Sequence, residues 1–224
     1  MQLSTSWARA RVTLALTIAT AAVWVVLSLL PARGLGVATL NDAAIVSGAF
    51  VPARISVWTD GGGLVPVWLT PLTAAFLHAG IIHLAFNLLM LVFCGRPTEA
   101  VVGPVGFSIL YLVGAYAAAA VHYLIDPTSP VPMIGASGAI SAVLGAYAIL
   151  FGRNKVKVAS PRLAVLLNAL WLMVAWVVLN VIVGFSFAQL SGGMLQMAVG
   201  AHIGGFIAGV ALANPLLLLR YRRA

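Results

Sequence analysis

A serine between small residues lies where a proline-rich stretch meets an apolar segment, in the run PVPMIGASGAIS at residues 130–141. Such a serine can stand at a helix N-terminus, where unpaired backbone N–H groups can hold a developing oxyanion. Ser137, flanked by Gly135 and Gly138, therefore suits a nucleophile. The same residues also suit a plain helix N-cap with glycines for close helix packing, and this stretch alone leaves both interpretations open.

Strongly polar side chains recur inside the apolar segments, where their desolvation is costly and a functional role is the default hypothesis. A lone histidine in such a segment also has a structural explanation, an interhelical hydrogen bond. His83 and Asn87 are four residues apart, so they share one face of a helix. The set comprises His78, His83, Asn87, His122, Ser137, Ser141 and His202.

A serine becomes an effective nucleophile when a base takes its proton, and neutral histidine is the usual base near pH 7. We expect His202 to be this base, and His83 and Asn87 to be candidate oxyanion donors alongside the Ser137 N–H. The chain has four acidic residues, and we place none of them inside an apolar segment. Asp126 is expected near the depth of the serine, but nothing places it behind a histidine, so the sequence favours a dyad over a triad.

The composition excludes an ordinary soluble protein. Hydrophobic residues make up 62% and charged residues 7% of the 224 residues, and the mean hydropathy is +1.10, whereas soluble domains carry roughly 25% charged residues. The net charge of +8 does not indicate a nucleic-acid partner, because the basic residues lie between and after the apolar runs. A single cysteine, Cys94, excludes an internal disulfide and is expected to be a packed small hydrophobe.

Six apolar segments predict an all-α membrane protein with one domain over residues 1–224. The first is long enough to cross the bilayer and too long for a signal-peptide core, so we expect an uncleaved helix. Residues 31–70 are rich in glycine and proline and predict a structured loop at the membrane interface. The predicted helices cover about 12–30, 72–94, 105–125, 135–151, 163–187 and 197–219.

The basic residues predict the orientation of these helices. Six spans place both termini on one side, and a cytoplasmic N-terminus leaves only Arg33 and Arg54, of twelve Lys and Arg residues, outside. The short termini carry no import extension, which favours a bacterial inner membrane. The basic residues assigned to the inside are Arg9, Arg11, Arg96, Arg153, Lys155, Lys157, Arg162, Arg220, Arg222 and Arg223.

Counting from these basic residues places the polar side chains in the outer half of the bilayer. At 1.5 Å per residue, Ser137 lies about 24 Å above Arg153, and His202 lies about 27 Å above Arg220. In a hydrocarbon core of about 30 Å, the two side chains could meet in a water-filled pocket that opens outward.

Small residues predict close contact between the fourth and sixth helices. The sixth carries Gly200-x3-Gly204 and Gly205-x3-Gly209, patterns that let helices touch. The fourth offers a matching surface of small residues, made by Gly138, Ala142 and Gly145.

Together these residues resemble the rhomboid family of intramembrane serine proteases, over essentially the whole chain. The order of the motifs is more specific than any one of them. The matching elements are Gly135-x-Ser137-Gly138, Ala201-His202-x-Gly204-Gly205, His78 with His83-x3-Asn87, Gly95-x3-Glu99, and Trp68 with Thr70-Pro71.

The resemblance implies a six-helix rhomboid-like bundle whose fourth helix starts below the membrane surface. Ser137 would be the nucleophile, His202 the general base, and His83 and Asn87 the oxyanion-hole side chains, with Gly135, Gly138 and His78 in support. Substrates would be transmembrane segments cleaved near their outer ends, without metal or cofactor. Two positions depart from the family pattern. Ser141 stands where many members carry an aromatic residue against the histidine, and Trp68-Leu69 replaces a Trp-Arg pair.

Other classes of function remain open on the sequence alone. A rhomboid-like protein without activity would bind transmembrane helices without cutting them. A small proton-coupled transporter would use His78, His83, His122 and His202 as its path, but the polar residues gather in one leaflet and no inverted repeat is visible. A zinc protease is disfavoured, because the chain has no HExxH motif. The sequence indicates membrane-embedded substrates and the lipid bilayer as partners, and no oligomeric state.

Overall fold

The computed structural model describes residues 7–34, 36–57, 65–152, 160–191 and 198–222. Within these ranges the chain is a helical bundle, which confirms the all-α prediction. Two isolated bridges, Pro31 to Thr39 and Phe50 to Met133, provide the only strand-like pairing described there. The elements are η1 (Trp7–Arg9), α1 (Arg11–Leu29), α2 (Leu40–Gly48), α3 (Ala53–Val57), α4 (Thr70–Thr73), η2 (Ala74–Phe76), α5 (Ile81–Ile125), α6 (Ser137–Phe151), α7 (Pro161–Ser191) and α8 (Val199–Tyr221).

Four helices are long and apolar enough to cross a membrane by length and composition: α1, α5, α7 over Leu163–Ile182, and α8. Helix α5 has 45 residues and contains the second and third predicted spans, which meet at a break where Gly103 has φ 78°. With α5 divided there and α6 included, the described residues hold the six predicted helical segments.

The second predicted segment differs from the structure at its start. Residues 72–76 belong to the short turns α4 and η2, and the long helix begins only at Ile81, nine residues later than expected. Leu77 and Gly80 have extended backbones that separate the turns from α5. His78, which we had placed in the second span, therefore lies in the connection before it.

The boundary between the second and third segments was also wrong. We expected Gly95 to Glu99 to separate two spans, yet these residues continue the helix, which tolerates Pro97 and breaks at Gly103 before Pro104. A left-handed φ is available to glycine at no steric cost, so Gly103 is where the chain can turn. Glu99 therefore lies inside α5, contrary to the expectation that no acidic residue does.

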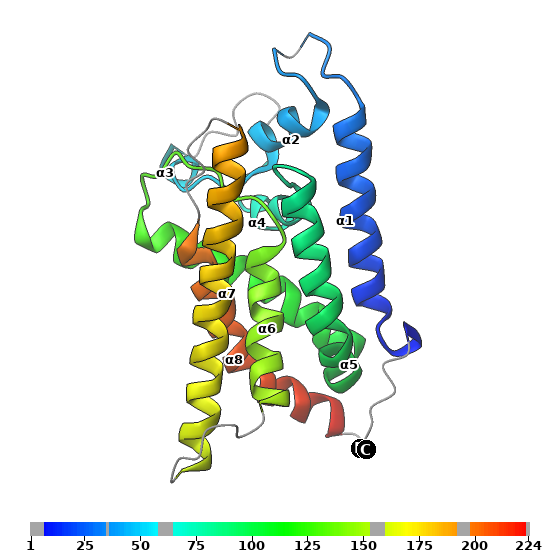
Figure 1. The fold of residues 1–224 in the computed structure, drawn as a ribbon, viewed down its shortest axis with the longest axis vertical. Coiled ribbons are helices and arrows are strands. Elements are labelled where there is room, and N and C mark those ends of the chain that lie inside the picture. Colours follow the sequence, from blue (N-terminus) through cyan, green and yellow to red (C-terminus); the bar gives the residue numbers. More distant parts are fainter. Residues whose placement is uncertain (1–6, 35, 58–64, 153–159, 192–197, 223–224) are drawn as a thin grey trace.

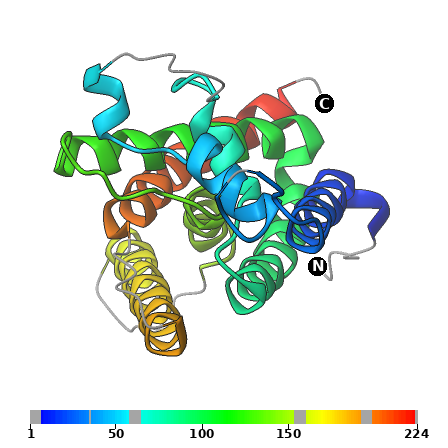
Figure 2. The same cartoon turned by 90° about the horizontal axis from the view of Figure 1, so that it is seen from above.

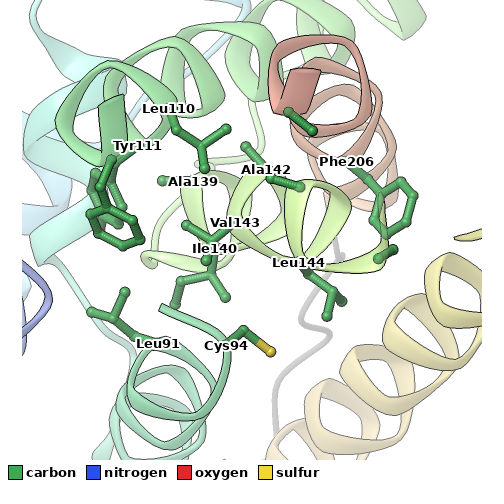
Figure 3. Close-up of a cluster of buried hydrophobic side chains, with 14 of the residues drawn as sticks. Leu91, Cys94, Leu110, Tyr111, Ala139, Ile140, Ala142, Val143, Leu144 and Phe206 are labelled. Atoms are coloured by element: carbon green, nitrogen blue, oxygen red, sulfur yellow. The ribbon is translucent and has the colours of Figure 1, made fainter. Parts of the chain in front are cut away.

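Helix α6 lies at the centre of the bundle. In Figure 1, α6 lies between α1 and α7, while the end of α5 projects past α7, and the view in Figure 2 agrees. Figure 3 shows Ile140 and Val143 of α6 surrounded by Leu91 and Leu110 of α5 and Phe206 of α8. Cys94 is buried in the same cluster, which confirms its predicted role as a packed residue.

The glycines of α8 allow this helix to approach two neighbours. A β carbon on Gly205 or Gly209 would collide with a backbone carbonyl oxygen of α6, that of Gly138 or Ala142. The predicted contact between the fourth and sixth helices is therefore confirmed. The other pattern serves a different helix, since a β carbon on Gly204 would lie 2.5 Å from the Ala117 carbonyl oxygen of α5.

The start of α1 and the end of α8 meet at Glu99. Its buried carboxylate accepts hydrogen bonds from the Val12 N–H at 2.9 Å and from the Thr13 N–H and hydroxyl at 2.7 Å each. It thus caps α1, whose N-cap residue makes no side-chain cap bond. Arg220 of α8 donates to the Ala100 carbonyl oxygen at 2.7 Å. Both ends of the described chain therefore lie at one end of the bundle.

The described residues between α1 and α5 form short helices and turns, while the predicted position of this segment at the membrane interface stays a prediction. Thr39 and Asp42 form a reciprocal capping box at the start of α2. Arg54 donates to the carbonyl oxygens of Ser47 at 3.1 Å and Val65 at 2.8 Å. Phe50 exchanges backbone hydrogen bonds with Met133, so this segment is joined directly to the chain that leads into α6.

The orientation prediction depends partly on residues outside the described ranges. These are Arg153, Lys155, Lys157 and Arg223, and the side chain of Arg162 is likewise not described.

Candidate active site

Ser137 is the first residue of α6, and its hydroxyl faces the imidazole of α8. Ser137 Oγ lies 3.0 Å from His202 Nε2, within hydrogen-bonding distance. Both side chains are buried, with exposed fractions of 8% for Ser137 and 4% for His202. The close packing at Gly205 brings the two helices near enough for this contact. A serine hydroxyl that can donate to a neutral imidazole is the arrangement that a base-activated nucleophile requires.

Gly135 leaves room for the side chains of α5 beside the serine. A β carbon at Gly135 would lie 2.7 Å from His83 Nε2 and 3.8 Å from Asn87 Nδ2, so both side chains face this part of the loop. Gly135 has φ 101°, which an L side chain rarely adopts. Its N–H donates to the Ala74 carbonyl oxygen at 2.8 Å, which fixes the loop against η2.

Asn87 is fully buried, and its amide group is only partly used. Nδ2 donates to the His83 carbonyl oxygen at 2.9 Å. An amide nitrogen carries two hydrogens, so a second one remains for another acceptor. Asn87 Oδ1 has no hydrogen-bond partner within the described part of the chain.

His78 is buried beside His83, and its backbone is held from two sides. The two imidazole centroids are 4.9 Å apart. The His78 carbonyl oxygen accepts from Trp24 Nε1 of α1 and from Asn41 Nδ2 of α2, each at 3.1 Å. This residue therefore ties the segment before α5 to its neighbours.

No carboxylate is hydrogen-bonded to His202 within the described residues. His202 Nδ1 is buried there without a partner. Asp126, the acidic residue expected nearest in depth, is exposed and accepts from the Thr128 N–H and hydroxyl instead. The geometry thus contains a serine and a histidine without a third acidic group.

Trp176 of α7 is part of this site, and it was not among the predicted site residues. Its indole and the His202 imidazole are nearly perpendicular, at 86°, with centroids 6.2 Å apart. Trp176 Nε1 donates to Ser141 Oγ at 2.7 Å. The one signal in the sequence was Ser141, which stands where many family members carry an aromatic residue against the histidine.

The remaining polar residues lie at the edge of the site. His122 is in the last turn of α5, next to the Phe50 ring, and its Nε2 has no partner among the residues described. Gly138 faces Ala118 of α5.

Across the described ranges no group of three or more His, Cys, Asp or Glu side chains could hold a metal ion.

Fold and site together define a multi-pass helical membrane protein in which a serine hydroxyl and an imidazole from different helices meet. The pattern of the Rhomboid domain matches residues 66–219. The chain belongs to the rhomboid family.

Curated relatives share moderate identity with this chain. Rhomboid protease GluP of Bacillus subtilis (strain 168) is 32% identical over 151 residues, which cover 66% of this chain and 27% of that protein. RHOMBOID-like protein 5 of Arabidopsis thaliana is 29% identical over 147 residues, or 66% of this chain and 43% of the relative. Human Rhomboid-related protein 3 is 36% identical over 76 residues, or 34% and 18% of the two chains. The chain therefore spans less than half the length of these relatives.

Proposed function

We propose that this protein is an intramembrane serine endopeptidase that cleaves transmembrane segments of other membrane proteins. The observation that carries the proposal is the 3.0 Å separation of Ser137 Oγ and His202 Nε2 across two helices. The protease named among its relatives supports the same class of reaction.

In the first step, His202 Nε2 takes the proton of the Ser137 hydroxyl as Oγ attacks the substrate carbonyl carbon. The negative charge that develops on the carbonyl oxygen is stabilised by donors from the Ser137 backbone N–H, Asn87 Nδ2 and His83. Asn87 retains one amide hydrogen for this purpose, and α6 contributes N–H groups that no helical carbonyl can satisfy.

In the second step, the carbon–nitrogen bond breaks and His202 gives its proton to the leaving amine. Water then attacks the acyl-enzyme, with His202 again as the base, and the Ser137 hydroxyl is restored. No metal or cofactor takes part in this scheme. His202 acts without an acidic partner, so the protein structure around its ring must hold its orientation.

The length of α6 supports a site that acts within the bilayer. Helix α6 has 15 residues and is about 22 Å long, shorter than a hydrocarbon core of about 30 Å. Ser137 stands at one end of it, so a substrate helix would meet the serine below the membrane surface. Because helical peptide bonds are shielded, the substrate must unwind first, which small or helix-breaking residues near its outer end favour.

We place the protein in a bacterial inner membrane with both termini cytoplasmic. Arg96, Arg220 and Arg222 belong to the end of the bundle where α1 begins and α8 ends, in agreement with the positive-inside rule. Its partners would be membrane-embedded substrates and lipids rather than nucleic acid.

The test is cleavage of a reporter in liposomes. The reporter is a single-pass membrane protein with glycine and alanine near the outer end of its transmembrane segment. We expect Ser137→Ala to abolish cleavage without changing thermal unfolding, because the variant loses only the attacking oxygen. Ser108→Ala is the control, since the Ser108 hydroxyl donates to Pro104 within α5, and it should cleave normally. Cleavage by Ser137→Ala at the normal rate would rule out the assignment.

A further inference from the structure

The imidazole of His202 needs a means of orientation, and α6 does not provide it. Its Nδ1 has no hydrogen-bond partner within the described residues. The residue one turn after Ser137 is Ser141, which presents a hydroxyl and no ring. A histidine fixed only through the hydrogen bond to its nucleophile could rotate when that proton is transferred.

A ring from another helix fills this space. Trp176 of α7 is 2% exposed, and it packs at 6.2 Å and 86° against the His202 imidazole. Edge-to-face aromatic pairs have centroids 4.5 to 7 Å apart, so this contact restricts rotation of the imidazole. Phe86 of α5 stacks on the indole at 5.7 Å and 15°, which leaves the indole little freedom of its own.

The same indole is also linked to the nucleophile. Trp176 Nε1 donates to Ser141 Oγ at 2.7 Å, and the Ser141 hydroxyl donates to the Ser137 carbonyl oxygen, also at 2.7 Å. All three groups are buried, so water does not compete strongly for these bonds. Trp176 therefore contacts His202 directly with its indole ring, and it is linked to Ser137 through the Ser141 hydroxyl.

We propose that Trp176 and Ser141 form a positioning pair for the serine-histidine dyad, in which an indole from α7, fixed by the Ser141 hydroxyl, orients the His202 imidazole. This inference rests on the proposed protease function. It explains why a small hydroxyl residue suits position 141, since a larger side chain there would take the place of the indole. It also makes the geometry of the dyad depend on the position of α7.

The test compares four variants by kcat and KM for the reporter and by the rate of labelling with a fluorophosphonate. Trp176→Leu fills space without an aromatic ring and should lower kcat and the labelling rate by about 10- to 100-fold, the scale of a small misplacement of a catalytic group. Ser141→Ala and Trp176→Phe each remove one end of the hydrogen bond and should lower both by a smaller, similar factor. In the double variant, kcat and the labelling rate should fall no further than in either single variant, because both substitutions remove the same hydrogen bond.

Rescue separates positioning from general packing. Trp176→Ala should be about as slow as Trp176→Leu, and adding Ser141→Tyr should restore much of kcat, because the new ring reaches His202 from α6. Trp171→Ala is the matched control, since Trp171 is on the same helix but is 67% exposed, and it should leave kcat unchanged.

The outcomes distinguish this inference from the proposed function. If the unmodified protein neither cleaves the reporter nor labels at Ser137, the protease assignment fails. If it does both, but Trp176→Leu retains normal kcat, or loses activity only through KM or a lower unfolding temperature, the positioning pair is overturned and the protease remains. Additive losses in Ser141→Ala with Trp176→Phe would overturn it as well.

Discussion

Gly135 occupies a position that no other residue can fill without strain. Its φ is 101°, and a β carbon would lie 2.7 Å from the His83 ring. Both features arise because the chain turns sharply at Gly135, just before Ser137, while the His83 and Asn87 side chains pack against this turn. The requirement for glycine here is therefore both conformational and steric.

Gly135→Ala is expected to lower kcat about 100-fold, because the loop or the His83 ring must shift by an ångström or so. A strained left-handed residue also costs about 1–2 kcal/mol of unfolding free energy. Gly34→Ala is a matched control, since Gly34 has φ 78° with nothing within 4 Å of a β carbon. It should show the conformational cost alone, with unchanged kcat. Equal kcat values for the two variants would contradict this account.

The sequence predicted those site residues that belong to local motifs. Gly135, Ser137, His83, Asn87 and His202 stand in short patterns, so residue type and spacing were sufficient to select them. Their catalytic roles stay predictions. Trp176 could not be selected in this way, because its contacts with Ser141 and His202 depend on how far α7 is rotated and shifted against α6 and α8. An apolar helix carries no pattern that specifies this arrangement.

At the scale of helices, Gly209 governs how closely α8 approaches α6. A β carbon there would overlap the Ala142 carbonyl oxygen, which is backbone and cannot rotate away. The two helices would have to separate, and with them Ser137 and His202, which lie nearer the start of each helix. Stability and activity should therefore fall together at this position.

Gly209→Ala is expected to lower the unfolding free energy by about 1–3 kcal/mol, the usual cost of overpacking, and to lower kcat for the reporter. Thermal unfolding in detergent and cleavage in liposomes measure the two effects. Ile207→Ala on the same helix is the control, since Ile207 is 57% exposed and should change neither. An unaltered Gly209→Ala protein would show that this contact does not set the helix spacing.

Helix existence was predictable, and the helix boundaries were less so. Each segment is a long run of apolar residues bounded by polar or basic ones, so the number of segments followed from how the apolar residues are distributed along the chain. The start of α5 did not, because residues 77–80 hold one polar side chain, that of His78, among small and apolar residues, and so resemble a continuing span. Residues Gly95 to Glu99 gave the opposite error. Their glycine, proline and charged side chains indicated a loop, whereas the structure continues α5 through them.

For the whole molecule, Glu99 connects three helices at one end of the bundle. Its carboxylate caps α1, its own helix is α5, and Arg220 of α8 binds the adjacent carbonyl oxygen. A carboxylate at a helix N-terminus also interacts favourably with the helix dipole. Glu99 was recognised as part of the Gly95-x3-Glu99 motif. Its contacts with Thr13 and Arg220 could not be predicted, because these residues are 86 and 121 positions away along the chain.

Glu99→Gln is expected to lower the unfolding free energy by about 2–4 kcal/mol, because an amide group would face N–H donors where the carboxylate now accepts three hydrogen bonds. The loss should appear in thermal unfolding, while kcat for the folded fraction changes little. Asp126→Asn is the control, as Asp126 is exposed and should unfold normally. A Glu99→Gln protein as stable as this control would refute the capping role.

The most direct test of the account is the site and rate of fluorophosphonate labelling, measured by peptide mass spectrometry on the folded protein in detergent. If His202 activates Ser137, a single adduct should form on Ser137, and labelling should be slowed about 100- to 10,000-fold in His202→Ala, the range that a general base contributes. An adduct on another residue, or an equal labelling rate in His202→Ala, would contradict it.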